Sequence, residues 1–133
     1  MITALRTAFC TWTPWEEKIT AAVVGRLEQK AREIIKGQLA AVNKVQRIVG
    51  WREVDLYVMK KGKVDWSGLP MLCDDREFVL ATVSTKAGAD RFETKVCCVG
   101  GHIFSFESER AVRPFAFRND VACDVTEFDR RFL

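Results

Sequence analysis

The chain contains very little histidine and no clustered cysteine. Its 133 residues include one histidine, His102, and no Cys-x-x-Cys pair. The five cysteines are Cys10, Cys73, Cys97, Cys98 and Cys123. Zinc sites need closer ligand spacing and more histidine, and a disulfide framework needs an even number of cysteines. The sequence therefore predicts no metal site and no cofactor, and it predicts free thiols, the usual state in a reducing cytoplasm.

Long apolar runs and long basic runs are missing as well. No apolar run approaches the roughly 18 residues that a membrane helix needs, so we expect a soluble cytoplasmic protein with no membrane partner. No five basic residues occur in a row, which disfavours nucleic acid as a partner. Residues 1–63 hold twelve Lys/Arg against six Asp/Glu, whereas residues 64–133 hold nine against twelve. This split suits either orientation toward a protein partner or second copy, or simply a solvated basic helix face.

A capped amphipathic helix is the clearest local pattern. The chain is long enough for one domain, 1–133. Thr13-Pro14-Trp15-Glu16 has the N-cap threonine, N1 proline and N3 glutamate of a capping box. Apolar residues then recur at helical spacing toward Gly50. Because one helix over 14–47 would be roughly 50 Å long at about 1.5 Å per residue, we expect a break or kink near Gly37 and a second, shorter helix after it.

After Gly50 the apolar residues alternate, which predicts strands. The expected strands cover 53–58, 64–66, 77–85, 91–99 and 102–108, with turns at Lys61-Gly62, Gly88 and Gly100-Gly101. The alternation places His102, Phe104 and Phe106 on one face of the last strand. Residues 115–117 are expected to add a short edge strand, and Val125, Phe128 and Phe132 predict a short C-terminal helix.

These elements predict an α+β fold in two layers, with the N-terminal helix packed on a curved antiparallel meander. The layout is similar to that of cystatin-like and nuclear-transport-factor-like folds. The similarity concerns layout alone and implies no activity.

Three residues are candidates for catalysis. His102 is the first choice for acid/base chemistry near neutral pH. Cys98 is a candidate nucleophile beside an imidazole, although its alternation with core positions also fits simple packing. Asp75 belongs to an acidic loop, where a solvated turn is the alternative to acid/base chemistry.

Aromatic residues carry most of the binding content. The candidate binding residues are Trp12, Trp66, Phe104, Phe106, Phe115 and Phe117. Aromatic side chains are enriched at interfaces, and several of these lie in irregular segments. The sequence thus favours a binding module that holds another protein or a second copy through an aromatic-lined groove. The alternative is a pocket for a small apolar ligand, or a cofactor-free acid/base enzyme that uses His102.

Overall fold

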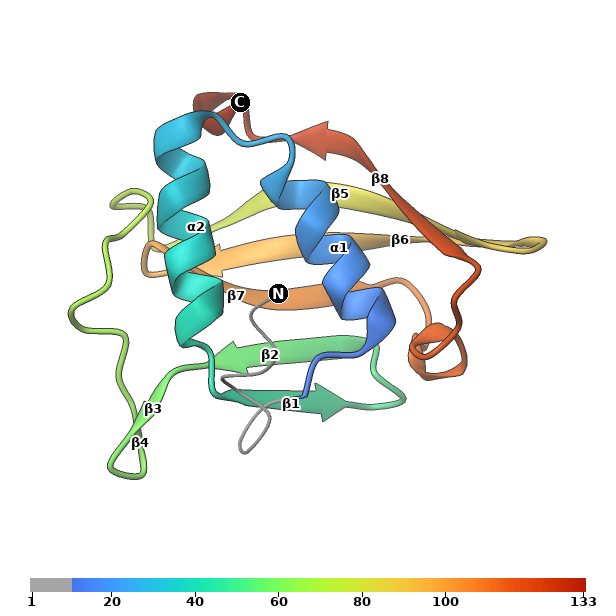
Figure 1. The fold of residues 1–133 in the computed structure, drawn as a ribbon, viewed down its shortest axis with the longest axis horizontal. Coiled ribbons are helices and arrows are strands. Elements are labelled where there is room, and N and C mark those ends of the chain that lie inside the picture. Colours follow the sequence, from blue (N-terminus) through green and yellow to red (C-terminus); the bar gives the residue numbers. More distant parts are fainter. Residues whose placement is uncertain (1–10) are drawn as a thin grey trace.

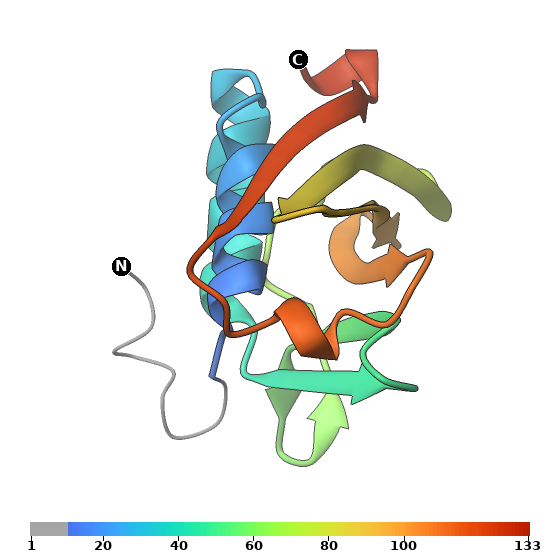
Figure 2. The same ribbon diagram turned by 90° about the vertical axis from the view of Figure 1, so that its right-hand side faces the viewer.

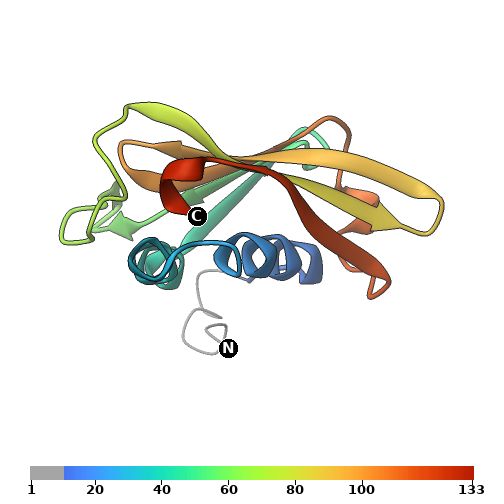
Figure 3. The same ribbon diagram turned by 90° about the horizontal axis from the view of Figure 1, so that it is seen from above.

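The computed structural model describes residues 11–133, and all structural statements below refer to them. Two helices, α1 (Pro14–Val24) and α2 (Gln29–Ala41), lie on one face of a six-stranded antiparallel sheet (Figures 1 and 3). The order of its strands is β1-β2-β7-β6-β5-β8. The predicted α+β fold, with N-terminal helices packed on an antiparallel sheet, is confirmed.

The strands of the main sheet differ strongly in length. They are β1 (Lys44–Ile48), β2 (Glu53–Tyr57), β5 (Glu77–Ala87), β6 (Asp90–Val99), β7 (His102–Ser108) and β8 (Val121–Phe128). The small hairpin of β3 (Met59–Lys60) and β4 (Lys63–Val64) forms a separate sheet. The turns predicted at Lys61-Gly62, Gly88 and Gly100-Gly101 join consecutive strands, as expected.

The first helix begins as the capping box predicts. Thr13 is the N-cap, its hydroxyl accepts from the Glu16 amide, and the Glu16 carboxylate accepts from the Thr13 amide. Pro14 occupies the first helical turn, where its missing N–H leaves no bond unmade.

The predicted break near Gly37 is wrong. Gly37 lies within α2, exposed, with no atom near its missing side chain. The helices separate instead at residues 25–28, because Gly25 ends α1 and the Glu28 carboxylate caps α2 by accepting from the Lys30 and Ala31 amides. The apolar residues after Ala41 form β1 rather than more helix, since Val45 and Ile48 are β-branched and pair with β2.

In the C-terminal part, the predicted edge strand at 115–117 is wrong, and the predicted short helix is present only in its last turn. Residues 121–128 form the strand β8. Besides the helical spacing, they also alternate at Val121, Cys123 and Val125, and the strand pairs with the edge of β5 that has no other partner. Only Arg130–Phe132 is helical, as one 3-10 turn. Residues 113–115 form another 3-10 turn, with Pro114 in it, and add no strand to the sheet.

The core fills the space between the helices and the sheet. Trp15, fully buried in α1, packs edge-on against Phe106 at 6.1 Å and is tilted against Phe92 at 6.3 Å between ring centroids. Its indole N–H donates to the Thr85 hydroxyl at 3.0 Å. Figure 2 shows the same layer from the side, with the sheet curving around the helix pair. Bulky side chains therefore occupy the interior in which a ligand pocket was the alternative prediction.

A bulge in β7 changes which residues share a face. Cys98 pairs with Ile103 and Cys97 with Ser105, so Phe104 is an extra residue on β7. As a result Ile103 and Phe106 enter the core, while Phe104 stays half-buried. The prediction that Phe104 and Phe106 lie on one face is therefore wrong, because strict alternation ends at the extra residue.

Four of the cysteines, Cys73, Cys97, Cys98 and Cys123, are free thiols, and Cys10 lies outside the described residues. Across residues 11–133, none of the helices has the length and apolar character required to traverse a bilayer.

Candidate functional site

His102 lies beside an indole, with its ring stacked on Trp66 at 4.2 Å between centroids and 7° between planes. Gln38, fully buried in α2, holds the loop that carries Trp66: its amide nitrogen donates to the Pro70 and Gly101 carbonyls. Burial lowers the pKa of His102. Its Nδ1 has no hydrogen-bond partner among residues 11–133. Within residues 11–133 no hydrogen bond therefore joins Nδ1 of this imidazole to a carboxyl group or a thiol.

The other two catalytic candidates, Cys98 and Asp75, have different contacts from those of His102. Cys98 is fully buried among core residues, and burial raises the pKa of its thiol well above the ordinary value. Asp75 is exposed and forms an ion pair with Arg131 at 2.8 Å. The structure brings none of the three candidates into hydrogen-bond contact with another.

The six predicted binding aromatics divide by burial. Trp12, Phe106 and Phe115 are buried, Trp66 and Phe104 are half-buried, and Phe117 is 66% exposed. Phe117 is therefore the one most available to a partner.

The turn that brings Trp51 to Phe117 contains two residues that the sequence did not single out for binding, Val49 and Trp51. The β1–β2 turn holds Val49, Gly50 and Trp51 in succession in the left-handed region, with φ of 47°, 65° and 68°. Left-handed backbone is strained for a bulky or β-branched residue, at a cost of about 1–3 kcal/mol per residue. Val49 is nevertheless 77% exposed, so no burial of its side chain offsets this cost.

Contacts with a second loop hold this turn in place. The Arg113 amide donates to the Gly50 carbonyl at 3.2 Å, and the Trp51 ring packs edge-on against Phe117 at 5.9 Å. Figure 1 shows the β1–β2 turn and the orange loop near residue 115 at the same end of the molecule. We call Val49, Trp51 and Phe117 with their neighbouring arginines the aromatic–arginine patch.

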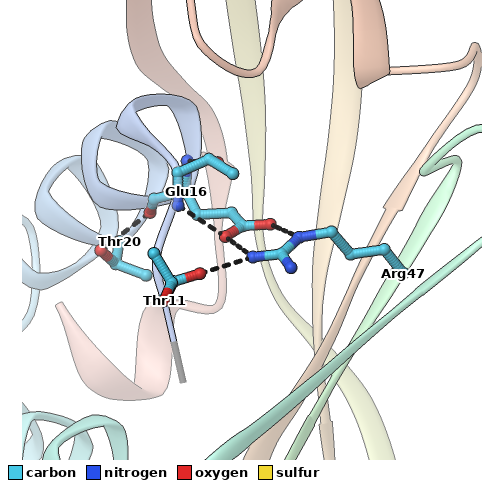
Figure 4. Close-up of polar contacts among 5 residues, drawn as sticks. Thr11, Glu16, Thr20 and Arg47 are labelled. Atoms are coloured by element: carbon cyan, nitrogen blue, oxygen red, sulfur yellow. Dashed lines mark hydrogen bonds and ion pairs between the residues drawn. The ribbon is translucent and has the colours of Figure 1, made fainter. Parts of the chain in front are cut away.

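Arg47 packs against the Trp51 ring of the patch. Its guanidinium lies over the Trp51 ring at 5.0 Å and donates to both carboxylate oxygens of Glu16, at 2.7 and 2.8 Å (Figure 4). It also donates to the Thr11 carbonyl. Because Glu16 is fully buried, this bidentate pair fixes the guanidinium firmly and thereby the plane on which Trp51 rests.

Positive charge surrounds the patch. The two segments that form it, 47–52 and 109–120, contain five arginines against two acidic residues. The arginines are Arg47, Arg52, Arg110, Arg113 and Arg118. Arg110 and Arg118 lie over the Phe115 ring, at 4.9 and 5.7 Å. Three of the five are neutralised by ion pairs, Arg47 with Glu16, Arg110 with Asp90 and Arg118 with Asp120. Among residues 11–133 the basic rim of the apolar patch therefore consists of Arg52 and Arg113, which form no ion pair.

Sequence reasoning missed Val49 and Trp51 for a physical reason. A left-handed turn is normally signalled by glycine or asparagine, and here only Gly50 carries that signal. The nearby arginines come from two segments far apart in sequence, so no basic run marks them.

A second surface feature is a groove of about 410 Å³ between the outer sides of α1 and α2. Trp12, Ala21, Val24 and Leu39 line it, and Glu17 and Lys36 are among its polar residues. It lies on the far side of the helices from the sheet and away from His102.

Comparison of the chain with protein-family models, with curated proteins and with solved structures found no match. The function must therefore be argued from the chain's own geometry.

Proposed function

We propose that this protein is a binding module that holds an acidic protein partner against the aromatic–arginine patch. The observation that carries this proposal is the strained turn at Val49–Trp51, which exposes the Val49 side chain and packs the Trp51 ring against the exposed Phe117. Strained backbone is frequent at functional surfaces, and the exposed Val49 side chain gains no burial from its left-handed conformation.

The chemistry of the patch defines the partner. Aromatic and arginine side chains are the residues most enriched at binding hot spots. The basic rim complements acidic side chains, and the apolar centre accepts a leucine or phenylalanine. The partner surface is therefore acidic, with an apolar side chain at its middle.

Labelled peptides test this proposal. One probe alternates aspartate with leucine and phenylalanine, a second replaces aspartate with lysine, and a third replaces the apolar residues with serine. Fluorescence anisotropy should show binding of the first probe only, with affinity that falls as salt rises. The Phe117→Ser and Arg113→Glu variants should each weaken it by about tenfold or more.

Matched controls come from the β3–β4 hairpin. Val64 is 54% exposed and Lys63 is exposed beside it, so Val64→Ser and Lys63→Glu make the same changes elsewhere. Equal weakening by these controls, equal binding of the lysine probe, or no binding of the acidic apolar probe would refute the proposal. Conversion of a dimer to a monomer by Phe117→Ser in sedimentation would show instead that the patch binds a second copy.

A further inference from the structure

The face of the sheet opposite the helices carries a group of carboxyl side chains. On β2, Val54 and Leu56 enter the core, so Glu53 and Asp55 point to the other face. On β7, Glu107 is paired directly with Glu53, and Ser105 with Asp55. Figure 3 shows both helices on one side of the sheet and no helix on the side where these residues lie.

Placing these carboxyl groups together is unfavourable for the isolated chain. Like charges directly opposite each other on paired strands destabilise a sheet. Among the ion pairs of residues 11–133, none includes Glu53, Asp55 or Glu107. The negative charge of this group is thus left without an ion pair.

Asp55 adds an independent sign of a missing partner. It is only 5% exposed, and within the described chain its Oδ1 has no hydrogen-bond partner. A buried carboxylate oxygen without a donor costs free energy that a bound donor would recover. The Oδ1 atom of Asp55 is therefore available to accept an N–H donor from a bound group.

Charged and titratable groups face Asp55 from each neighbouring strand. From β1 come Gln46, directly opposite, and Lys44; Glu53 and Tyr57 flank it on β2. From β7 come Ser105 and Glu107, and from β6 come Cys97 and Lys95, which pair with them. Burial, followed by Glu53 and Glu107, raises the pKa of Asp55 to about 7, partly opposed by Tyr57. Burial raises the pKa of Cys97 to about 12, so its thiol stays neutral.

The geometry favours an organic cation over a metal ion. No group of three His, Cys, Asp or Glu side chains in the part of the chain described here is arranged to hold a metal. A guanidinium is planar, carries five N–H donors and stacks on aromatic rings. The Tyr57 and Phe104 rings, packed edge-on at 5.5 Å, lie on β2 and β7 beside the carboxyl groups.

We propose that this carboxyl face of the sheet binds an arginine side chain of a protein partner, with Asp55, Glu53 and Glu107 accepting its N–H groups. The site is separate from the aromatic–arginine patch, which has the opposite charge. An arriving guanidinium would favour the ionised form of Asp55, so binding should release protons near neutral pH and strengthen as the pH rises from 6 to 8.

The test uses four probes on the whole chain. They are a short glycine–serine peptide with one central arginine, the same peptide with lysine, the same peptide with neutral citrulline, and free agmatine. Backbone amide chemical shifts report where each probe binds. The arginine peptide should give saturable shifts in β2 and β7, the lysine peptide should bind more weakly, and citrulline should give none.

Two isosteric variants provide the control. Asp55→Asn should weaken arginine-peptide binding by about tenfold or more and remove its pH dependence. Glu77→Gln, which removes one exposed carboxylate from β5, should change the affinity less than about twofold. Retained binding in Asp55→Asn, shifts outside β2 and β7, or equal binding of citrulline would overturn the proposal. If agmatine binds as tightly as the peptide, the ligand is a small organic cation and the proposal of an arginine from a protein partner is refuted.

Discussion

The two faces of the six-stranded sheet hold their buried carboxyl groups differently. On the helix face, Glu16 is fully buried and receives both a bidentate guanidinium from Arg47 and the Thr13 amide. On the open face, Asp55 is almost as deeply buried, yet its Oδ1 receives no donor from residues 11–133. The first shows how this fold satisfies a buried carboxylate, and the second shows what the open face lacks.

The difference has a consequence for stability. A satisfied buried ion pair is costly to break, because removing one partner strands the other charge. An unsatisfied buried carboxyl group is costly to keep, because its ionised form is poorly solvated. Substitutions of these groups on the two faces should therefore change the free energy of unfolding in opposite directions.

Removing Arg47 should have the largest effect. Arg47→Met leaves the fully buried Glu16 without its guanidinium, and we expect a loss of about 3–5 kcal/mol in the free energy of unfolding, measured by urea denaturation. The double variant Glu16→Gln/Arg47→Met should recover part of this loss. A loss below about 1 kcal/mol would show that the pair is solvated despite its burial.

Replacing Asp55 should instead raise the free energy of unfolding. The folded-state pKa of about 7 exceeds the ordinary aspartate pKa of 3.8, so the folded protein binds the proton more tightly and Asp55 lowers stability as the pH rises between these values. Asp55→Asn should therefore be nearly neutral at pH 4 and stabilise the fold by up to about 4 kcal/mol at pH 8. Urea denaturation at both pH values checks this, with the exposed Asp124→Asn as control; a gain that does not depend on pH would contradict it.

A substitution at Val49 tests whether the strained turn serves binding at the expense of stability. Val49→Asn suits the left-handed backbone better and should stabilise the fold by about 1 kcal/mol, while weakening binding of the acidic apolar peptide. Lys61 is the matched control, because its φ of 53° is similarly left-handed in the β3–β4 turn. Lys61→Asn should stabilise the fold without affecting the peptide. If Val49→Asn and Lys61→Asn change peptide binding equally, the strain at Val49 has no role in binding.

The adjacent cysteines offer the mildest test. Cys97 lies on the open face and is 8% exposed, whereas Cys98 lies in the core and is 0% exposed. Burial raises the pKa of both thiols, so iodoacetamide should label the half-buried Cys73 first, Cys97 more slowly and Cys98 last, as measured by mass spectrometry of peptides. Faster labelling of Cys98 than of Cys97 would reverse the assignment of faces.

Local patterns predicted much of the fold and little of the site. The capping box at Thr13 and the glycine turns depend on neighbouring residues only, so sequence sufficed for them. The helix break was missed because apolar residues continue at helical spacing through residues 25–28, where Gly25 ends α1 and Glu28 caps α2. β8 was missed because residues 121–128 fit both helical spacing and alternation, and pairing with the distant β5 selected the strand. Of the aromatic–arginine patch, only Phe117 was among the predicted binding residues.

The sequence by itself determined where α1 starts, where the hairpins turn and which strand residues alternate, because capping and left-handed glycine turns are local. Only the tertiary structure decided that Glu53 lies opposite Glu107 and that Trp51 packs against Phe117. Those contacts join segments more than 50 residues apart, and they follow from strand register and loop packing, which no local pattern records.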